Sequence, residues 1–122
     1  MHQKERTIVV VEDDASLREA LERLLSVAGF KTRSFADAEQ LLEASAARTA
    51  ACLVLDVDLP LLSGFDLHQQ LLKSGIRPPT VFISAHDEPE ARLQATAAGA
   101  AYLPKPFAAQ RLVEAVNHAI SA

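Results

Sequence analysis

The chain has 122 residues, of which 49% are hydrophobic and 23% charged, and its formal net charge is −4. This length predicts one domain over residues 1–122, and the negative charge argues against direct nucleic-acid contact. The single cysteine excludes an intrachain disulfide and a cysteine zinc site, and indicates a reducing cytoplasm. The sequence has neither an apolar run of membrane-spanning length nor a signal-peptide pattern, so no membrane association is expected.

Strand-like and helix-like patterns alternate along the whole chain. Thr7–Val11 is a β-branched run typical of a buried strand. The stretch Leu17–Ala28 carries apolar residues three and four positions apart, with Asp14 or Ser16 as its N-cap and Gly29 as its stop. The same criteria predict the remaining elements in chain order: an edge strand Lys31–Phe35, a helix Asp37–Ala46, a central strand Ala51–Leu55, a helix Gly64–Lys73, a strand Pro79–Ile83, a helix Glu88–Ala98, a strand Ala101–Leu103 and a helix Phe107–Ile120.

This alternation predicts an α/β fold of five strand–helix repeats, (βα)5. The strands are expected to form a doubly wound, five-stranded parallel sheet with helices on both faces. In open sheets of this kind, ligands bind beyond the carboxyl ends of the strands, where the direction of winding reverses. The residues directly after each predicted strand are therefore the candidates for a functional site.

Polar side chains follow four of the five predicted strands. Clustered carboxylates repel one another, and a divalent cation such as Mg²⁺ relieves that repulsion. A nearby ammonium and hydroxyl suit the oxygens of a phosphoryl group, so this edge suits phosphoryl transfer to a carboxylate. Asp13 and Asp14 have an alternative role as caps of the first helix. The four sequences are Glu12-Asp13-Asp14, Asp56-Val57-Asp58, Ser84-Ala85-His86 and Pro104-Lys105-Pro106.

Five short motifs span almost the whole chain. They are Val9–Asp14, Leu55–Pro60 followed by Ser63-Gly64, Ile83-Ser84-Ala85, Ala98-Gly99-Ala100 and Leu103–Phe107. Together they resemble the signature of CheY-like receiver domains of two-component response regulators, and are most similar to receivers of the FixJ kind. The resemblance implies a flavodoxin-like strand order, 2-1-3-4-5, and an effector that acts in bacterial transcription regulation.

The resemblance implies that Asp56 is the phosphoacceptor, which takes a phosphoryl group from a histidine kinase or a phosphotransfer protein. It also implies a bound Mg²⁺ ion, with Mn²⁺ as an alternative, held by Glu12, Asp13, Asp56 and the backbone carbonyl of Asp58. Arg18 stands where the family often has an arginine. Self-phosphorylation and autodephosphorylation are then single-turnover events, so the chain is not expected to be an enzyme in the ordinary sense.

The remaining roles implied by the resemblance concern the switch. Ser84 and Lys105 are expected to contact the phosphoryl oxygens, and Ser84 and Tyr102 to change position together. The Lys105–Pro106 bond is expected to be cis, a geometry that is rare outside X–Pro bonds. The surface formed by the fourth helix, the fifth strand and the fifth helix is expected to form a homodimer or bind an effector domain in the bacterial cytoplasm.

Other side chains are expected near the site or at the surface. We expect His86 and Asp58 to flank the phosphoryl group and to set how water reaches it, and hence the rate of dephosphorylation. His68 and His118 are expected on exposed helix faces. Leu61 is apolar where many relatives have glycine or a polar residue, which predicts an apolar rim for a partner.

Two other functions remain open from the sequence alone. Asp56-Val57-Asp58 also resembles the D-x-D motif of haloacid-dehalogenase-like phosphohydrolases, although Pro60 departs from that family's pattern. The other alternative is a protein-binding module that works without phosphorylation, and the intact set of acids, hydroxyl and lysine argues against it. Turnover of a phosphomonoester distinguishes the first alternative, and a Mg²⁺ titration distinguishes the second.

Overall fold

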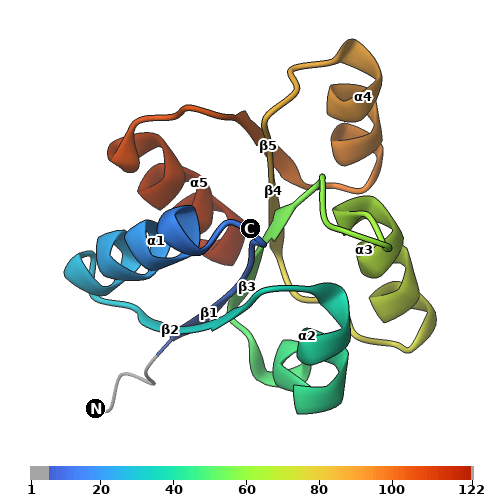
Figure 1. Ribbon diagram of the computed structural model, residues 1–122, viewed down its shortest axis with the longest axis horizontal. Helices are drawn as coiled ribbons and strands as arrows, with labels where there is room; N and C mark the ends of the chain where they lie inside the picture. The colour runs from blue at the N-terminus through green and yellow to red at the C-terminus, as the bar shows by residue number, and fades with distance from the viewer. Residues whose placement is uncertain (1–5, 122) are drawn as a thin grey trace.

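Five parallel strands form a single sheet in the order β2-β1-β3-β4-β5 (Figure 1). The computed structural model describes residues 6–121, so residues 1–5 and 122 of the predicted domain lie outside the described residues. The predicted strand order is confirmed, with β2 at an edge and β3 in the centre. The strands are β1 (Thr7–Val11), β2 (Lys31–Phe35), β3 (Cys52–Asp56), β4 (Thr80–Ser84) and β5 (Ala101–Pro104).

Helices cover both faces of the sheet (Figure 1). Two of them, α1 and α5, pack on one face, and α2, α3 and α4 pack on the other. Within residues 6–121, no helix combines the length and the apolar character needed to cross a membrane. The helices are α1 (Ala15–Val27), α2 (Ala38–Ala44), the short 3-10 helix η1 (Ala46–Thr49), α3 (Gly64–Lys73), α4 (Pro89–Ala97) and α5 (Ala109–Ser121).

The end of α2 is where the predicted elements differ in kind from the observed ones. The prediction continued this helix to Ala46, but it ends at Ala44. Ser45 adopts the left-handed conformation, with φ 53°, and η1 follows. One residue in this conformation ends an α-helix because the chain leaves the helical path there. No glycine marks this position in the sequence, so the pattern of apolar residues gave no signal for it.

The central strands are buried on both faces, as their apolar sequences predict. Successive side chains of a strand point to opposite faces, so each strand contributes to two cores. Strand residues in the core under α2, α3 and α4 are Val9, Val11, Leu53, Leu55 and Phe82. Strand residues in the core under α1 and α5 are Ile8, Val10, Cys52, Val54, Val81, Ile83 and Leu103.

The prediction that His68 lies at the surface is wrong. His68 exposes 5% of its surface, and its ring meets the ring of Phe82 edge-on, with centroids 5.4 Å apart. It lies three residues after Phe65 and three before Leu71, which places it on the buried face of α3. Burial lowers the pKa of the His68 imidazole. His118 is exposed on α5, as predicted.

The register of the strands brings their carboxyl ends to one edge of the sheet. Val11 of β1 is aligned with Leu55 of β3, and Ser84 of β4 is aligned with Pro104 of β5. The residues that follow these positions therefore lie side by side, although the chain segments that carry them are far apart in sequence.

Candidate functional site

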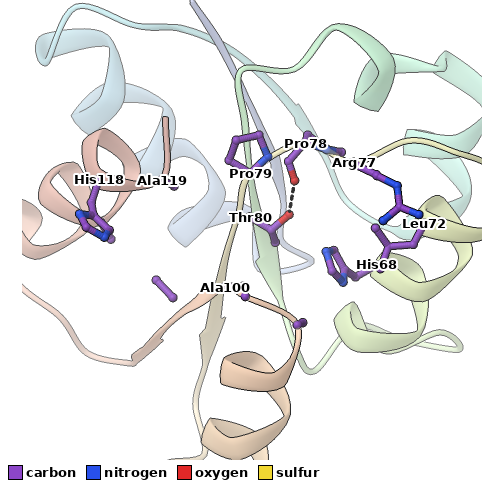
Figure 2. Close-up of a pocket in the computed structure, with 13 residues that line it drawn as sticks. His68, Leu72, Arg77, Pro78, Pro79, Thr80, Ala100, His118 and Ala119 are labelled. Atoms are coloured by element: carbon purple, nitrogen blue, oxygen red, sulfur yellow. Dashed lines mark hydrogen bonds between the residues drawn. The ribbon is translucent and has the colours of Figure 1, made fainter. Parts of the chain in front are cut away.

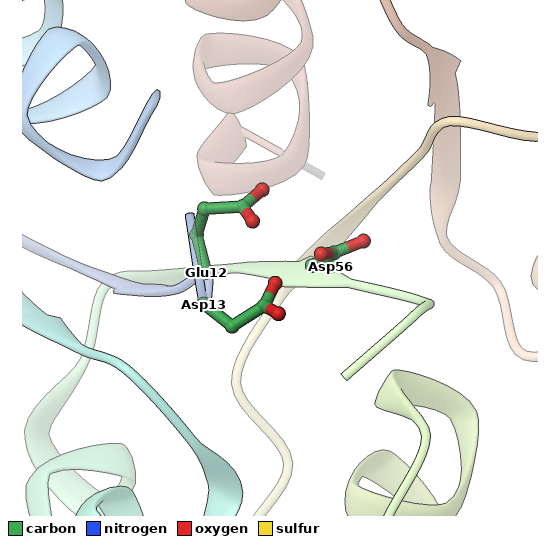
Figure 3. Close-up of side chains that lie close together, drawn as sticks. All are labelled: Glu12, Asp13 and Asp56. Carbon is green, nitrogen blue, oxygen red and sulfur yellow. The ribbon is translucent and has the colours of Figure 1, made fainter. Parts of the chain in front are cut away.

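Three carboxylates from two neighbouring strands converge at this edge (Figure 3). Glu12 and Asp13 directly follow β1, Asp56 ends β3, and oxygens of the three side chains lie within 4.8 Å of one another. Glu12 and Asp56 are buried, whereas Asp13 is exposed. Asp14 has a different role, because its carboxylate accepts two backbone N–H groups in the first turn of α1. Asp14 is therefore the helix cap, and Asp13 faces the other acids.

Glu12 is a buried acid held by three neighbours. Its carboxylate accepts the Asp14 N–H at 3.1 Å and the Lys105 ammonium at 2.8 Å, and its backbone carbonyl accepts the Arg18 guanidinium at 2.8 Å. Burial, with a contribution from the charge of Asp56, raises the pKa of Glu12 to about 7 despite the first two bonds. Burial therefore disfavours the charged form of Glu12, and a cation bound at the cluster would offset that penalty.

Lys105 brings a positive charge from the end of β5 to the acids. Its Nζ lies 2.8 Å from Glu12 Oε1 and 3.4 Å from Asp56 Oδ2. Its backbone N–H donates to the Ser84 carbonyl at 2.6 Å, and its peptide bond to Pro106 is cis, as expected. Burial lowers the pKa of the Lys105 ammonium, but the hydrogen bond to Glu12 and the charge of Asp56 outweigh burial, so the pKa is raised. The amine therefore stays charged beside the acids.

Ser84, Asp58, His86 and Tyr102 form one hydrogen-bonded chain next to Asp56. The Ser84 hydroxyl lies 3.1 Å from Asp58 Oδ2 and 3.1 Å from the His86 carbonyl, and it accepts the His86 N–H at 3.0 Å. The His86 ring Nδ1 lies 3.4 Å from the same Asp58 oxygen. The Tyr102 hydroxyl donates to the His86 carbonyl. The loop after β4 therefore connects the hydroxyl beside Asp56 to the ring on β5.

The three carboxylates fit a hard divalent cation. Carboxylate oxygens are the ligands that Mg²⁺ prefers, and one oxygen from each acid lies within 4.8 Å of the others, which makes the three acids candidate ligands of one ion. The backbone of Asp58 lies at the same place, because its N–H donates to Asp56 Oδ1 at 3.0 Å. The loop after Asp56 returns close to the strand end at Gly64, the first residue of α3. Only glycine fits there, since a Cβ would collide with the Asp56 carbonyl oxygen.

A hollow of about 410 Å³ lies at the other end of the sheet (Figure 2). Its lining includes Pro79 and Thr80 at the start of β4, together with His68 of α3 and His118 of α5. The Thr80 hydroxyl donates to the carbonyl of Pro78 at 3.0 Å. None of the lining residues is acidic, and β4 separates this hollow from Ser84 and the acids. The carboxyl edge of the sheet, which holds the convergent charges, is therefore the better candidate for chemistry.

The structure brings the predicted site residues to one edge of the sheet. Sequence reasoning missed several contacts there, of which two are examples. One is the bond from Ser84 to the Asp58 carboxylate, which joins side chains 26 residues apart and leaves no periodic signal. The other is the hydrogen bond from the Arg18 side chain to the Glu12 carbonyl. The sequence indicated that an arginine is common at this position in the family, but not what Arg18 contacts. The residues gathered at the edge are Glu12, Asp13, Asp56, Asp58, Ser84, His86, Tyr102 and Lys105.

Comparisons with known proteins agree with this arrangement. The family model of the response regulator receiver domain matches residues 8–117. The transcriptional regulatory protein TdiR of Thauera aromatica is 38% identical over 116 residues, which are 94% of this chain and 51% of TdiR. Nodulation protein W of Bradyrhizobium diazoefficiens is 38% identical over 110 residues, 89% of this chain and 48% of that protein. The chain thus spans about half the length of these curated relatives.

Solved structures show the same fold. The response regulator StyR superimposes with a TM-score of 0.88 at 40% identity, covering 96% of this chain and 60% of StyR. A response regulator receiver protein from Burkholderia phymatum gives a TM-score of 0.83 at 34% identity, covering 96% of each chain. The fold and its edge of acids define a doubly wound α/β protein with its site at the carboxyl ends of the strands. The chain belongs to the response regulator receiver family of two-component systems.

Proposed function

We propose that Asp56 accepts a phosphoryl group from the phosphohistidine of a histidine kinase or phosphotransfer protein. One observation carries the proposal: Asp56 is buried at the end of the central strand, within 4.8 Å of two other carboxylates and 3.4 Å from an ammonium. A lone buried acid in that place has no structural role, whereas an acid among oxygen ligands and a fixed positive charge suits phosphoryl chemistry.

The transfer is a displacement at phosphorus. An oxygen of ionised Asp56 forms the new P–O bond, the P–N bond of the donor breaks, and its electron pair returns to the imidazole nitrogen. The donor leaves as neutral imidazole when its other nitrogen carries a proton. Lys105 offsets the negative charge of the phosphoryl oxygens, and the Ser84 hydroxyl donates to one of them. Positioning and charge compensation are the contributions that this reaction needs from the protein.

Glu12, Asp13, Asp56 and the backbone carbonyl of Asp58 would hold a Mg²⁺ ion, or Mn²⁺ in its place. The spacing of the carboxylates and the raised pKa of Glu12 support this assignment, because a cation at the cluster lowers the repulsion among three acids. When bound, the cation supplies charge neutralisation to the phosphoryl oxygens.

The proposed output is a change in the surface formed by α4, β5 and α5. Ser84 would move toward the phosphoryl group, and Tyr102, joined to it through the His86 carbonyl, would follow. This surface would then bind an effector domain or a second copy of the chain, without itself contacting DNA. TdiR, a transcriptional regulatory protein about twice as long as the matched region, supports a role in transcription regulation in the bacterial cytoplasm.

Loss of the phosphoryl group would complete a single-turnover cycle. Asp58 and His86 stand beside Ser84 with exposed side chains, 40% and 66% accessible, where they would set how water reaches the acyl phosphate. Unchanged dephosphorylation rates in both Asp58→Asn and His86→Ala would contradict this assignment.

Acetyl phosphate, a small phosphodonor, tests the proposed function without a partner protein. Intact mass should show one added phosphoryl group in the presence of Mg²⁺, little without Mg²⁺, and none in Asp56→Asn. Asp66→Asn is the matched control, because Asp66 is an exposed acid in the first turn of α3, and it should behave as wild type. Phosphorylation of Asp56→Asn, or continuous hydrolysis of a phosphomonoester, would contradict the proposal.

A further inference from the structure

The hydroxyl of Ser84 has a single proton and two acceptors within reach. One acceptor is Asp58 Oδ2 and the other is the His86 carbonyl oxygen, each at 3.1 Å. An ionised carboxylate is the stronger acceptor of the two. The proton of Ser84 is therefore directed mainly toward Asp58 in the unphosphorylated protein.

The same proton is needed for the function proposed above. A hydroxyl that donates to Asp58 has no second proton for a phosphoryl oxygen on Asp56. The contact between Ser84 and Asp58 must therefore break before Ser84 engages the phosphoryl group.

We infer that Asp58 is a positioning residue whose carboxylate holds the Ser84 hydroxyl in its unphosphorylated position and so opposes the switch. The inference rests on the proposed function, since it describes a competitor for one of the groups in that site. This role differs from the one proposed above, in which Asp58 affects the rate of dephosphorylation. Here Asp58 affects how readily the activated state forms.

The surroundings of Asp58 suit such a role. Its backbone N–H donates to Asp56 Oδ1 at 3.0 Å, which fixes the main chain, while its side chain is 40% exposed and contacts Ser84 and the His86 ring through one oxygen. Truncating the side chain therefore leaves the backbone contact and the buried core intact, so the variant should fold.

Contacts also connect Ser84, in its unphosphorylated position, to α4. The Tyr102 hydroxyl donates to the His86 carbonyl, and the Arg92 guanidinium of α4 lies over the Tyr102 ring at 5.3 Å. Arg92 is itself bound to Asp87 at 2.6 Å. Releasing Ser84 from Asp58 therefore changes the loop that carries the His86 carbonyl, and with it the anchor of Tyr102.

A double-mutant cycle between Asp58→Ala and Ser84→Ala tests the inference. The probe is beryllofluoride, a mimic of the phosphoryl group on an aspartate, titrated at a Mg²⁺ concentration shown to saturate each variant. Intrinsic fluorescence reports binding, because the chain has one tyrosine, Tyr102, and no tryptophan. In the chain with Ser84 present, Asp58→Ala should tighten apparent binding about tenfold, the usual scale for a lost hydrogen bond to a charged group. With Ser84→Ala, the same change should tighten it less than about twofold.

Charge alone predicts a different result. Removing a negative charge next to the site would strengthen anion binding equally with and without Ser84, and equal tightening in both backgrounds would overturn the inference. Glu88→Ala is the charge control, because Glu88 is an exposed acid in the same loop whose side chain makes no cap hydrogen bond. Tightening by Glu88→Ala as large as that by Asp58→Ala would also overturn it.

The same measurements distinguish a failure of the proposed function from a failure of this inference alone. If the wild-type protein binds no beryllofluoride and acetyl phosphate adds no phosphoryl group to Asp56, the proposed function fails and the inference falls with it. If both reactions occur at Asp56 and Asp58→Ala does not tighten binding, the receiver function stands and the inference alone is wrong.

Discussion

Two helices on opposite faces of the sheet, α4 and α5, are anchored very differently. On one face, α1 and α5 each bury two aliphatic side chains: Leu21, Leu25, Leu112 and Val116. On the other face, the buried residue of α4 is Ala95. A buried leucine makes several times the apolar contact of an alanine, so α5 is held much more firmly than α4.

Hollows accompany the weaker anchoring of α4. The hollow of about 410 Å³ in Figure 2 and a smaller one of about 130 Å³ are both lined by His68 and Ala98. The small residues Ala98, Gly99 and Ala100, which follow α4, line the larger hollow. The difference teaches how one small domain combines a fixed site with a movable element. The strands β1 and β3, which carry the acids, are buried between helices on both faces, whereas α4 buries a single small side chain.

The largest expected effect tests this difference directly. Leu112→Ala in α5 should lower the free energy of unfolding by roughly 3 kcal/mol, because it leaves a cavity in a fully buried site. Ala95→Gly, which removes the buried side chain of α4, should cost only about 1 kcal/mol, mostly through helix propensity. Urea denaturation followed by circular dichroism measures both.

Amide hydrogen exchange provides an independent measurement of the same comparison. Amides of α4 should exchange through openings of clearly lower free energy than those of α5. Equal protection of the two helices, or equal losses in the two variants, would mean that α4 is anchored by contacts other than its buried side chain.

Most of the fold could be predicted because the periodic signals are strong. The observed bounds of β2 and α3, Lys31–Phe35 and Gly64–Lys73, equal the predicted ones. His68 was misplaced because its polarity was given more weight than its spacing from Phe65 and Leu71. Its burial depends on how α3 packs against β4, where the ring meets Phe82, and that is a tertiary property that no local pattern contains.

The site could be predicted as a set of residues but not as a set of contacts. Acids after parallel strands must share an edge, so the grouping of Asp13 and Asp56 followed from the fold. Which acceptor a hydroxyl selects among several nearby groups depends on differences of a few tenths of an ångström. The sequence therefore could not reveal that Ser84 contacts Asp58, or that Lys105 lies nearer to Glu12 than to Asp56.

A second, smaller effect concerns His68 of α3, on the same face of the sheet as α4. Burial lowers its pKa, so below the ordinary value of 6.5 the unfolded chain binds more protons than the folded one. Stability should therefore be unaffected by His68 above pH 6.5 and fall as the pH drops below it, by at most about 1.4 kcal/mol per pH unit. His68→Leu should remove this part of the pH dependence in urea denaturation between pH 7.5 and 5.

His118 offers the matched control for that experiment. It also lines the hollow but is exposed on the firmly anchored helix α5. His118→Gln should leave the pH dependence of stability as in wild type. If His68→Leu and His118→Gln gave the same profile, the buried position of His68 would have no energetic consequence, and the face with α4 would be better hydrated than its geometry indicates.

The smallest expected effect concerns backbone strain at two residues with positive φ, one on each face of the sheet. On the face that carries α5, α1 is followed by Gly29 at φ 99°, where glycine carries no strain and a Cβ would meet nothing within 4 Å. On the other face, the loop before α3 places Leu61 at φ 68° with its side chain fully exposed. A leucine in this conformation costs about 1 kcal/mol, partly offset by the flexibility that glycine has in the unfolded chain.

Leu61→Gly should therefore raise the free energy of unfolding by less than about 1 kcal/mol, and Gly29→Ala should lower it by about 1 kcal/mol. Because neither position has packing to lose, the two changes isolate backbone strain, and their signs must be opposite. A loss of stability in Leu61→Gly would show that the exposed leucine makes contacts that outweigh its strain. The apolar rim predicted at Leu61 would then stabilise the folded chain itself, rather than serve only as a surface for a partner.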